Sequence, residues 1–185
     1  MSELVFGWGN TSFSAQTEYL ERCMVEVAKS TGPILECGSG LSTLVLGTVA
    51  QRNNLKMWSF ENSPEWALRV RTQLEKYGIT SVKVCDTPLR SYGEYNWYDS
   101  SGESLPNDFG LVICDGPPAQ TPGGRYGMYP QVKGRLRPDC KIMVDDADRE
   151  QEREICARWK QENGGRFEIF GETKRFIVFD CGSQG

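Results

Sequence analysis

The sequence predicts an α/β fold, a doubly wound, mostly parallel sheet of seven strands with helices on both faces. Short apolar stretches alternate along the chain with longer amphipathic ones, and repeated strand–helix units form parallel sheets that helices cover on both faces. Residues 166–181 form two alternating segments around Gly171–Thr173, which is typical of an antiparallel hairpin. The sequence contains no linker, repeat or low-complexity tract. We therefore expect one domain over 1–185, with an N-terminal helical segment at 1–31 and a Rossmann-like core at 32–180.

The expected strands and helices follow one another in a regular order. Buried strands are expected at residues 33–37, 56–61, 81–86, 109–115 and 140–146. Helices are expected at residues 17–30, 42–52, 63–78, 129–136 and 148–165. Residues 87–108 form a long aromatic segment without a clear period, for which the pattern predicts irregular structure.

Residues that favour helix ends mark two of these helices. Ser63 and Pro64 suit the N-cap and the first position of the helix at 63–78, and Gly78 suits its end. Ser12 or Ser14 is the candidate N-cap of the first helix, because a hydroxyl can accept a hydrogen bond from a free backbone N–H there.

The overall composition narrows the class of protein. The 185 residues carry a net charge of −4, which disfavours a nucleic-acid partner. No apolar stretch approaches the roughly 20 residues of a membrane span, and the first residues lack the pattern of a signal peptide. None of the seven cysteines forms a C-x-x-C pair, which favours free thiols in a reducing compartment. We therefore expect a cytoplasmic protein that acts without a membrane or a nucleic acid.

The absence of histidine limits the chemistry that the chain can perform. The sequence has no histidine, which excludes Ser-His-Asp and Cys-His mechanisms, imidazole-bound metals and histidine bases. Proton transfer must then use Asp, Glu, Lys, Tyr, Cys or water. Any metal must be a hard cation that oxygen ligands hold.

A glycine turn follows the first strand, in the stretch PILECGSGLST at Pro33–Thr43. A dinucleotide fingerprint, G-x-G-x-x-G, would need a glycine where Thr43 stands, and the G-K-[ST] of a phosphate-binding loop is absent. Glu36, two residues before Gly38, would repel a pyrophosphate but suits a ligand with a positive charge, such as an ammonium or a sulfonium. The turn therefore disfavours a nicotinamide dinucleotide.

Acidic residues end five consecutive strands, at the edge where open α/β sheets bind ligands. They are Glu36, Glu61, Asp86, Asp115 and the pair Asp145–Asp146. Glu61 closes the second strand about 20 residues after the glycines, where a carboxylate takes ribose hydroxyls in such sheets. A lone acid would be explained more simply as a helix cap or a turn residue, but acids at five strand ends indicate a site.

These motifs resemble the class I S-adenosylmethionine-dependent methyltransferases. The matching features are E-x-G-x-G at Glu36–Gly40, the acid after the second strand, and D-G-P-P at Asp115–Pro118. The resemblance implies that Glu36 faces the methionine moiety and that the turn passes under the cofactor. It also implies that Glu61 binds the ribose and that Asp86 lies near the adenine, while Ser42 replaces the family's third glycine. The implied cofactor site comprises Glu36, Gly38, Ser39, Gly40, Ser42, Glu61, Asn62, Asp86, Thr87 and Asp115.

The acids after the fourth and fifth strands form a candidate metal site. Asp115, Asp145 and Asp146 could hold Mg²⁺ or another hard divalent cation. This arrangement is similar to the catechol O-methyltransferase branch, which implies a metal that binds the acceptor hydroxyl as a Lewis acid. Pro118 stands where that branch has a lysine. In the alternative interpretation Asp146 and Asp148 cap the next helix, and the sequence leaves both interpretations open.

The resemblance predicts transfer of a methyl group from S-adenosylmethionine to a small molecule, at an oxygen atom. Asp115 and Asp145 are the candidate catalytic residues, because the chain has neither a histidine nor that lysine to activate the acceptor. One alternative is a non-catalytic cofactor-binding scaffold with the same fold. A nicotinamide-dependent oxidoreductase is a second alternative, which Glu36 and Thr43 disfavour.

Further candidates lie in the loops near the expected acceptor site. Arg125 and Tyr126 suit substrate contacts, although a solvated, mobile loop is the simpler interpretation. Trp97 and Tyr98 suit a pocket wall or the core equally well. Arg149 opposes the dipole of the helix that it begins, so we expect it to pair with Asp145, Asp148 or a substrate anion.

Overall fold

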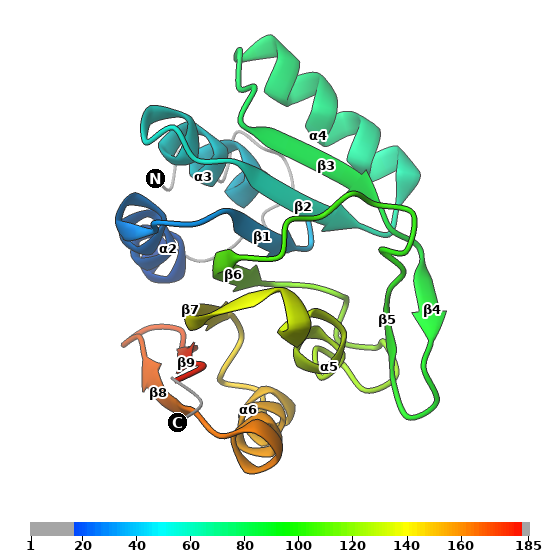
Figure 1. Ribbon diagram of the computed structural model, residues 1–185, viewed down its shortest axis with the longest axis vertical. Coiled ribbons are helices and arrows are strands. Elements are labelled where there is room, and N and C mark those ends of the chain that lie inside the picture. Colours follow the sequence, from blue (N-terminus) through cyan, green and yellow to red (C-terminus); the bar gives the residue numbers. More distant parts are fainter. Residues whose placement is uncertain (1–16, 183–185) are drawn as a thin grey trace.

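The structure of the protein, a computed structural model, describes residues 17–182. In this part of the chain seven strands form one sheet in the order β3-β2-β1-β6-β7-β9-β8 (Figure 1). The strands are β1 (Ile34–Cys37), β2 (Met57–Glu61), β3 (Val82–Asp86), β6 (Phe109–Cys114), β7 (Leu136–Val144), β8 (Arg166–Phe170) and β9 (Phe176–Asp180). The strands from β3 to β7 run parallel, and β9 is antiparallel to β7 and β8. The predicted fold class is confirmed.

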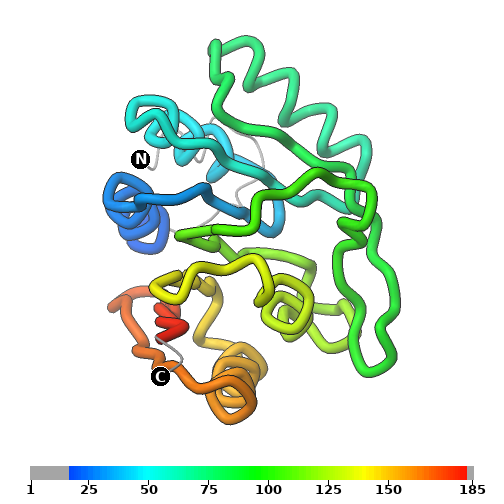
Figure 2. The backbone as a smooth tube through the Cα atoms, in the orientation of Figure 1, coloured from blue at the N-terminus to red at the C-terminus, as the bar shows by residue number. Residues whose placement is uncertain are grey.

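The first strand lies in the middle of the sheet. β1 pairs with β2 on one side and with β6 on the other, so that Ile34 is opposite both Met57 and Leu111. The path of the chain in Figure 2 shows β6 beside β1 although the two are far apart in the sequence. The strand order reverses between β1 and β6, and open α/β sheets bind ligands beyond the carboxyl ends of the strands at such a point.

Helices cover both faces of the sheet (Figure 1). They are α2 (Thr17–Lys29), α3 (Leu41–Arg52), α4 (Pro64–Lys76), α5 (Met128–Val132), the 3₁₀ helix η1 (Lys133–Arg135) and α6 (Glu150–Asn163). Successive residues of β1 point to opposite faces: Ile34 packs with core residues of α2 and α3, whereas Leu35 packs with those of α5 and α6. Because helices bury both faces of the sheet, all four residues of β1 are buried, and they are apolar except for Glu36.

The helix at Pro64–Lys76 has the ends that the sequence predicts. The Ser63 hydroxyl accepts a hydrogen bond from the Trp66 backbone N–H (3.3 Å), and Pro64 begins the helix. Gly78 follows the end with φ +64°, and the Ile79 N–H donates to the carbonyl of Leu74 (2.9 Å). This is the hydrogen bond of a glycine-terminated helix end.

The start of α6 differs from the capping interpretation. The N-cap residue is Arg149, and no side chain of the described residues caps the helix there. Asp148 instead accepts a hydrogen bond from the Arg175 backbone N–H (3.0 Å). Capping of α6 by Asp146 and Asp148 is therefore wrong. Ser12 and Ser14, the candidate caps of the first helix, lie outside the described residues.

A hairpin lies within residues 87–108, where the sequence pattern predicted irregular structure. β4 (Leu89–Ser91) and β5 (Asn96–Tyr98) pair in antiparallel register. Each strand has only three residues, too few for an alternating pattern to show. Trp97 is fully buried in the core, and Tyr98 is buried beside Phe60.

The cysteines and the helices bear on two further expectations, free thiols and the lack of a membrane span. All seven cysteines lie within residues 17–182, where each is buried and has a free thiol. The helices of this same part of the chain include none with the length and apolar character needed to cross a membrane.

Candidate active site

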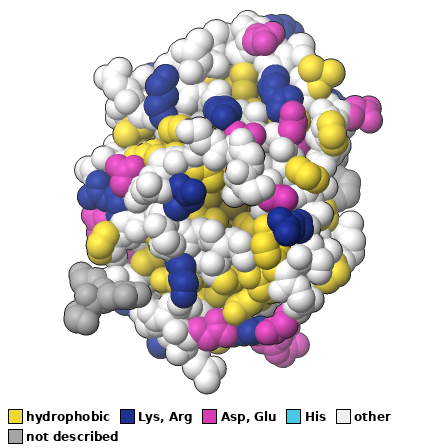
Figure 3. All heavy atoms as spheres, turned by 45° about the vertical axis from the view of Figure 1, so that its right-hand side comes forward, with side chains coloured by type: hydrophobic (Ala, Val, Ile, Leu, Met, Phe, Trp, Pro, Cys, Tyr) yellow, Lys and Arg dark blue, Asp and Glu magenta, His cyan; other side chains and the backbone are white. Residues whose placement is uncertain are grey.

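A cavity of about 410 Å³ opens at the carboxyl ends of the central strands. It is lined by residues 38–42, Glu61, Asn62, Trp66, Tyr98, 115–120, Arg125, Asp145, Asp146, Arg149 and Lys174. A volume of this size is typical of pockets that hold a cofactor or a small ligand. Figure 3 shows the side of the molecule that carries the β4–β5 hairpin, where hydrophobic side chains gather in a hollow flanked by charged ones.

The glycine turn forms one wall of the cavity. Gly38 has φ +93°, a left-handed conformation. A Cβ at Gly38 would lie 3.0 Å from the backbone nitrogen of Gly116. Gly40 is extended, with φ 178°, and no described atom lies within 4 Å of its Cβ position. The backbone itself therefore requires Gly38, whereas Gly40 leaves open space at the cavity wall.

Alanine at these two glycines should separate folding from ligand binding. We expect Gly38→Ala to lower the free energy of unfolding by about 1–2 kcal/mol, because an L residue is strained at this φ. Gly40→Ala should change it by less than about 0.5 kcal/mol, but should weaken binding of S-adenosylhomocysteine, the ligand type that the resemblance implies, about tenfold. Urea unfolding and calorimetry measure the two effects. An equal loss of stability in both variants would contradict this division.

Glu36 lies behind the turn. Its side chain is fully buried and accepts hydrogen bonds from the hydroxyls of Ser42 (2.7 Å), Thr43 (2.6 Å) and Ser59 (2.5 Å). Thr43 Oγ1 in turn accepts one from the Gly40 backbone N–H (2.8 Å). Contrary to the expectation that it faces the ligand, Glu36 does not line the cavity. Its carboxylate instead holds the turn in shape.

The charge of Glu36 should make the stability of the fold depend on pH. Burial raises the pKa of Glu36 to about 7 from an ordinary value of 4.5, although the three hydroxyls favour its charged form. Between pH 4.5 and about 7, the folded protein therefore keeps a proton on Glu36 that the unfolded chain has released. The stability that this proton contributes is fully present below pH 4.5 and is lost as the pH rises to about 7. Relative to Glu36→Gln, the free energy of unfolding should fall by up to about 1.4 kcal/mol per pH unit. Urea unfolding of both proteins across this window checks it, and parallel pH dependences would disprove it.

Glu61 ends β2 and lines the cavity. Its Oε2 accepts hydrogen bonds from the backbone N–H (3.2 Å) and the hydroxyl (2.7 Å) of Ser39, and its Oε1 accepts one from the Ser63 N–H (2.9 Å). The Trp66 indole N–H donates to the carbonyl of Ser39 (2.8 Å). These bonds hold the Glu61 carboxylate at the cavity wall together with Asn62.

Asp86 and Thr87 do not line the cavity, contrary to the expected adenine contact. Asp86 ends β3, the edge strand of the sheet, and pairs with Arg71 (2.7 Å) while its side chain remains 53% exposed. Thr87 is fully buried, and its N–H donates to the carbonyl of Glu61 (2.8 Å). Both residues therefore support the edge of the sheet beside the cavity.

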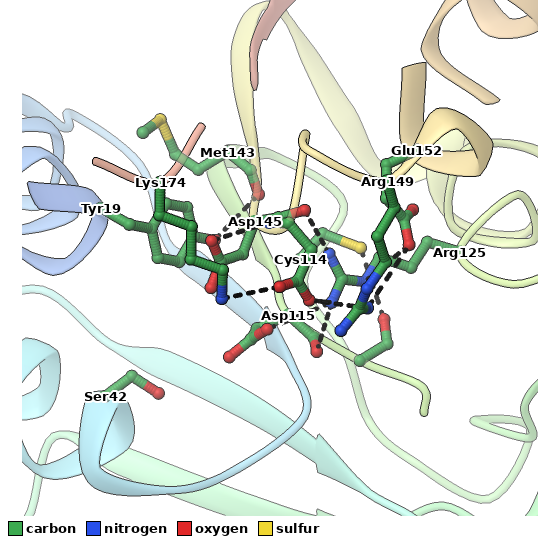
Figure 4. Close-up of polar contacts among 12 residues, drawn as sticks. Tyr19, Ser42, Cys114, Asp115, Arg125, Met143, Asp145, Arg149, Glu152 and Lys174 are labelled. Atoms are coloured by element: carbon green, nitrogen blue, oxygen red, sulfur yellow. Dashed lines mark hydrogen bonds and ion pairs between the residues drawn. The ribbon is translucent and has the colours of Figure 1, made fainter. Parts of the chain in front are cut away.

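The acids after β6 and β7 come together as the sequence indicates. Carboxylate oxygens of Asp115, Asp145 and Asp146 lie within 4.8 Å of one another. Arg125, which is only 2% exposed, reaches this cluster (Figure 4). Its Nη2 donates to the side chains of Asp146 (2.9 Å) and Asp115 (3.2 Å). Its Nη1 donates to the backbone carbonyl of Asp145 (2.5 Å).

Two further cations pair with Asp146. Its Oδ2 lies 2.7 Å from Arg149 Nη1, and its Oδ1 lies 2.7 Å from Lys174 Nζ. Arg149 thus pairs with Asp146, whereas Asp145 or Asp148 was the expected aspartate partner. Asp146 has φ +62°, which is uncommon for a residue other than glycine, and its N–H donates to Asp145 Oδ1 (2.7 Å). Because side-chain cations already occupy both oxygens of Asp146, the residues as arranged do not fit a divalent metal centre.

Asp115 and Asp145 differ in their access to the cavity. Burial raises the pKa of Asp115 to about 8, against the opposing effect of Arg125. The side chain of Asp115 nevertheless remains 23% exposed. Burial also raises the pKa of Asp145, which is only 2% exposed. Of these two aspartates, Asp115 is therefore the one whose carboxyl group is more accessible to a ligand in the cavity.

The loop that carries Arg125 is packed, whereas the simpler expectation was a solvated loop. Arg125 and Tyr126 are both buried. The guanidinium of Arg158 lies 3.9 Å from the centroid of the Tyr126 ring, and the Tyr126 hydroxyl donates to Glu162 (2.8 Å). Tyr95 packs edge-on against the same ring at 5.2 Å between centroids. These contacts fix the loop so that Arg125 enters the acidic cluster.

Lys174 is a cavity residue that the sequence did not predict. It lies between β8 and β9, and the antiparallel pairing of β7 with β9 brings it to the strand end that carries Asp146. The Ala147 N–H donates to the carbonyl of Arg175 (2.8 Å), which fixes the approach of the hairpin. A lysine beside a hairpin turn is unremarkable in the sequence, so only the long-range pairing could have found it.

Comparison with known proteins decides the family. A family profile described as "Methyltransferase domain" matches residues 35–147, which is more than half of the chain. The chain belongs to this methyltransferase family. The resemblance to the S-adenosylmethionine-dependent methyltransferases is thereby confirmed. No curated protein sequence matches the methyltransferase.

Solved structures agree with the methyltransferase fold. The S-adenosylhomocysteine-bound methyltransferase PaMTH1 from Podospora anserina is 15% identical, with a TM-score of 0.70 over 95% of this chain and 86% of that one. The O-methyltransferase TomG from Streptomyces achromogenes, in complex with S-adenosylmethionine, is 13% identical, with a TM-score of 0.64 over 97% and 86%. A precorrin-6y C5,15-methyltransferase from Geobacter metallireducens is 12% identical, with a TM-score of 0.64 over 92% and 91%. At these identities the likeness shows the fold alone.

Proposed function

We propose that this methyltransferase transfers a methyl group from S-adenosylmethionine to a hydroxyl oxygen of a small molecule. The observation that carries the proposal is that one cavity brings together the open glycine turn at Gly40, the carboxylate of Glu61 and the reachable carboxyl group of Asp115. The likeness to PaMTH1 and TomG supports the cofactor, and TomG supports oxygen as the acceptor atom.

In the proposed reaction each of these groups has its own task. Glu61 accepts hydrogen bonds from the ribose hydroxyls, and the open space at Gly40 lets the cofactor lie against the backbone. Bound S-adenosylmethionine supplies the methyl group on a sulfonium sulfur. Asp115 accepts the proton of the acceptor hydroxyl as the C–O bond forms and the C–S bond breaks, which leaves S-adenosylhomocysteine. Asp145 does not contact the acceptor in this proposal. Its Oδ1 accepts a hydrogen bond from the Asp146 N–H and so fixes the backbone at the end of β7, beside Asp115.

The proposed acceptor is a small metabolite, and the proposed location is the cytoplasm. The cavity of about 410 Å³ must hold both the cofactor and the reacting part of the acceptor, and the net charge of −4 disfavours a nucleic-acid acceptor. Seven buried free thiols suit a reducing compartment. The proposed reaction uses no divalent cation, because the expected ligand Asp146 is already paired with three side-chain cations of the described residues.

Calorimetry followed by a methyl-transfer screen tests the proposal. We expect the protein to bind S-adenosylhomocysteine and not NAD, and to transfer labelled methyl groups to hydroxylated metabolites in preference to amines. Preferential binding of NAD would overturn the cofactor assignment. Binding of S-adenosylhomocysteine without transfer to any acceptor would favour the non-catalytic scaffold, and transfer only to nitrogen or carbon would overturn the assignment of the acceptor atom.

A further inference from the structure

The acidic cluster contains its own cation. The guanidinium of Arg125 contacts the carboxylates of Asp115 and Asp146 and the backbone carbonyls of Asp115 (2.9 Å) and Asp145 (2.5 Å). Its Nε lies 3.9 Å from Glu152 Oε1. Carboxylate and carbonyl oxygens from neighbouring strand ends are the ligands that a hard divalent cation takes. In this protein they converge on a guanidinium.

Packing around Arg125 places the guanidinium in this position. Its side chain is only 3% exposed, and the packed ring of Tyr126 anchors the next residue of the loop. Gly124 has φ +53°, and a Cβ there would lie 2.6 Å from the side chain of Gln151 on α6. The loop therefore approaches α6 closely enough to direct Arg125 inward. A guanidinium keeps its charge at every pH that the folded protein experiences.

We propose that Arg125 takes the place of a divalent metal ion in this site. Its charge neutralises the carboxylates, its planar group positions Asp115 toward the cavity, and its bulk excludes a metal ion from the cluster. Arg125 is a positioning residue, because it acts through Asp115 and Asp146. The role of Asp115 rests on the proposed function, whereas the exclusion of metal rests on the contacts that Arg125, which is buried, makes within the cluster, beside the partly exposed cations Arg149 and Lys174.

A Mn²⁺-binding measurement tests this proposal without any assay of activity. Electron paramagnetic resonance detects the free ion, so binding is measured as the loss of the free-ion signal. We expect the parent protein and Arg125→Lys to bind no Mn²⁺ at this site at millimolar concentrations, because both keep a cation in the cluster. In Arg125→Gln the side chains of Arg149 and Lys174, which are 45% and 31% exposed, can turn to solvent and release Asp146. This variant should therefore bind one Mn²⁺ per chain, and the additional change Asp146→Asn should abolish that binding. As a matched control, Arg137→Gln removes an arginine that is 33% exposed and does not line the cavity, and it should not create a site.

The outcomes separate this inference from the proposed function. One Mn²⁺ bound by the parent protein and lost in Asp146→Asn would overturn the inference, even if methyl transfer is confirmed. Folded Arg125→Gln that binds no Mn²⁺ would also overturn it. If Arg125→Gln does not fold alone, refolding in Mn²⁺ should recover it and refolding in EDTA should not, and failure in both would contradict the replacement of one cation by the other.

Discussion

Replacing Asp115 by Asn should lower kcat for methyl transfer by a factor of about 10² to 10⁴, because general-base catalysis contributes this much when a positioned group accepts the proton. Asn has nearly the same shape as Asp, and its carbonyl oxygen can still accept the hydrogen bond that Arg125 donates at 3.2 Å. The variant therefore removes the base while it keeps the contact that positions it. Initial rates with the acceptor from the methyl-transfer screen measure the effect.

The pH dependence of the parent protein gives this prediction a second readout. The base form of Asp115 predominates above its pKa of about 8, so kcat should rise with pH up to that value and then level off. Asp115→Asn should lose this rising limb, while calorimetry with S-adenosylhomocysteine should show affinity within about threefold of the parent. Asp139→Asn, at an aspartate whose side chain is 69% exposed, is the matched control. If Asp115→Asn keeps more than a tenth of the parent kcat, Asp115 is not the base.

Replacing Glu61 by Ala should weaken binding of S-adenosylhomocysteine by about 1–3 kcal/mol, which is roughly 5- to 150-fold in the dissociation constant. The Glu61 carboxylate lines the cavity and is held there by Ser39 and Ser63. Its loss removes the acceptor for the ribose hydroxyls and also frees the Ser39 N–H. Calorimetry with the purified variant measures the change in affinity.

A ligand comparison separates these two consequences of Glu61→Ala. An analogue of S-adenosylhomocysteine that lacks both ribose hydroxyls should bind the parent weakly and should lose little further affinity in the variant. Glu65→Ala, at an exposed acid in the first turn of α4, controls for the loss of one negative charge nearby. Equal losses for the two ligands would show that Glu61 acts only on the shape of the turn and does not bind the ribose.

The elements that form the sheet were predictable because their signals are local. Apolar runs of about five residues, separated by amphipathic stretches, predicted β1, β2, β3, β6 and the end of β7 in the right order. Ser63, Pro64 and Gly78 marked the ends of α4, since helix ends depend on the hydrogen bonds of a few neighbouring backbone groups. The β4–β5 hairpin escaped prediction because three-residue strands carry too little pattern, and contacts with the rest of the core stabilise them.

The direction of each acidic side chain was not predictable to the same degree. The sequence placed acids at the right strand ends, and the three aspartates after β6 and β7 do meet. Glu36, however, points to hydroxyls of α3 and β2 behind the turn. Asp86 lies at the edge strand with Arg71, away from the cavity wall. Strand ends share an edge because of the topology, but the face that each side chain takes depends on local register and on its partners.

The sequence by itself determined the fold class, the glycine turn, the absence of histidine chemistry and the methyltransferase resemblance, because these depend on residue type, spacing and periodicity along the chain. Only the tertiary structure decided how the acidic cluster is neutralised. Arg125 and Lys174 reach Asp146 from segments that are distant in the sequence, through a packed loop and through the antiparallel pairing of β7 with β9. An ion pair between such segments leaves no periodic trace in the sequence, because its geometry follows from the packing of the whole sheet and its helices.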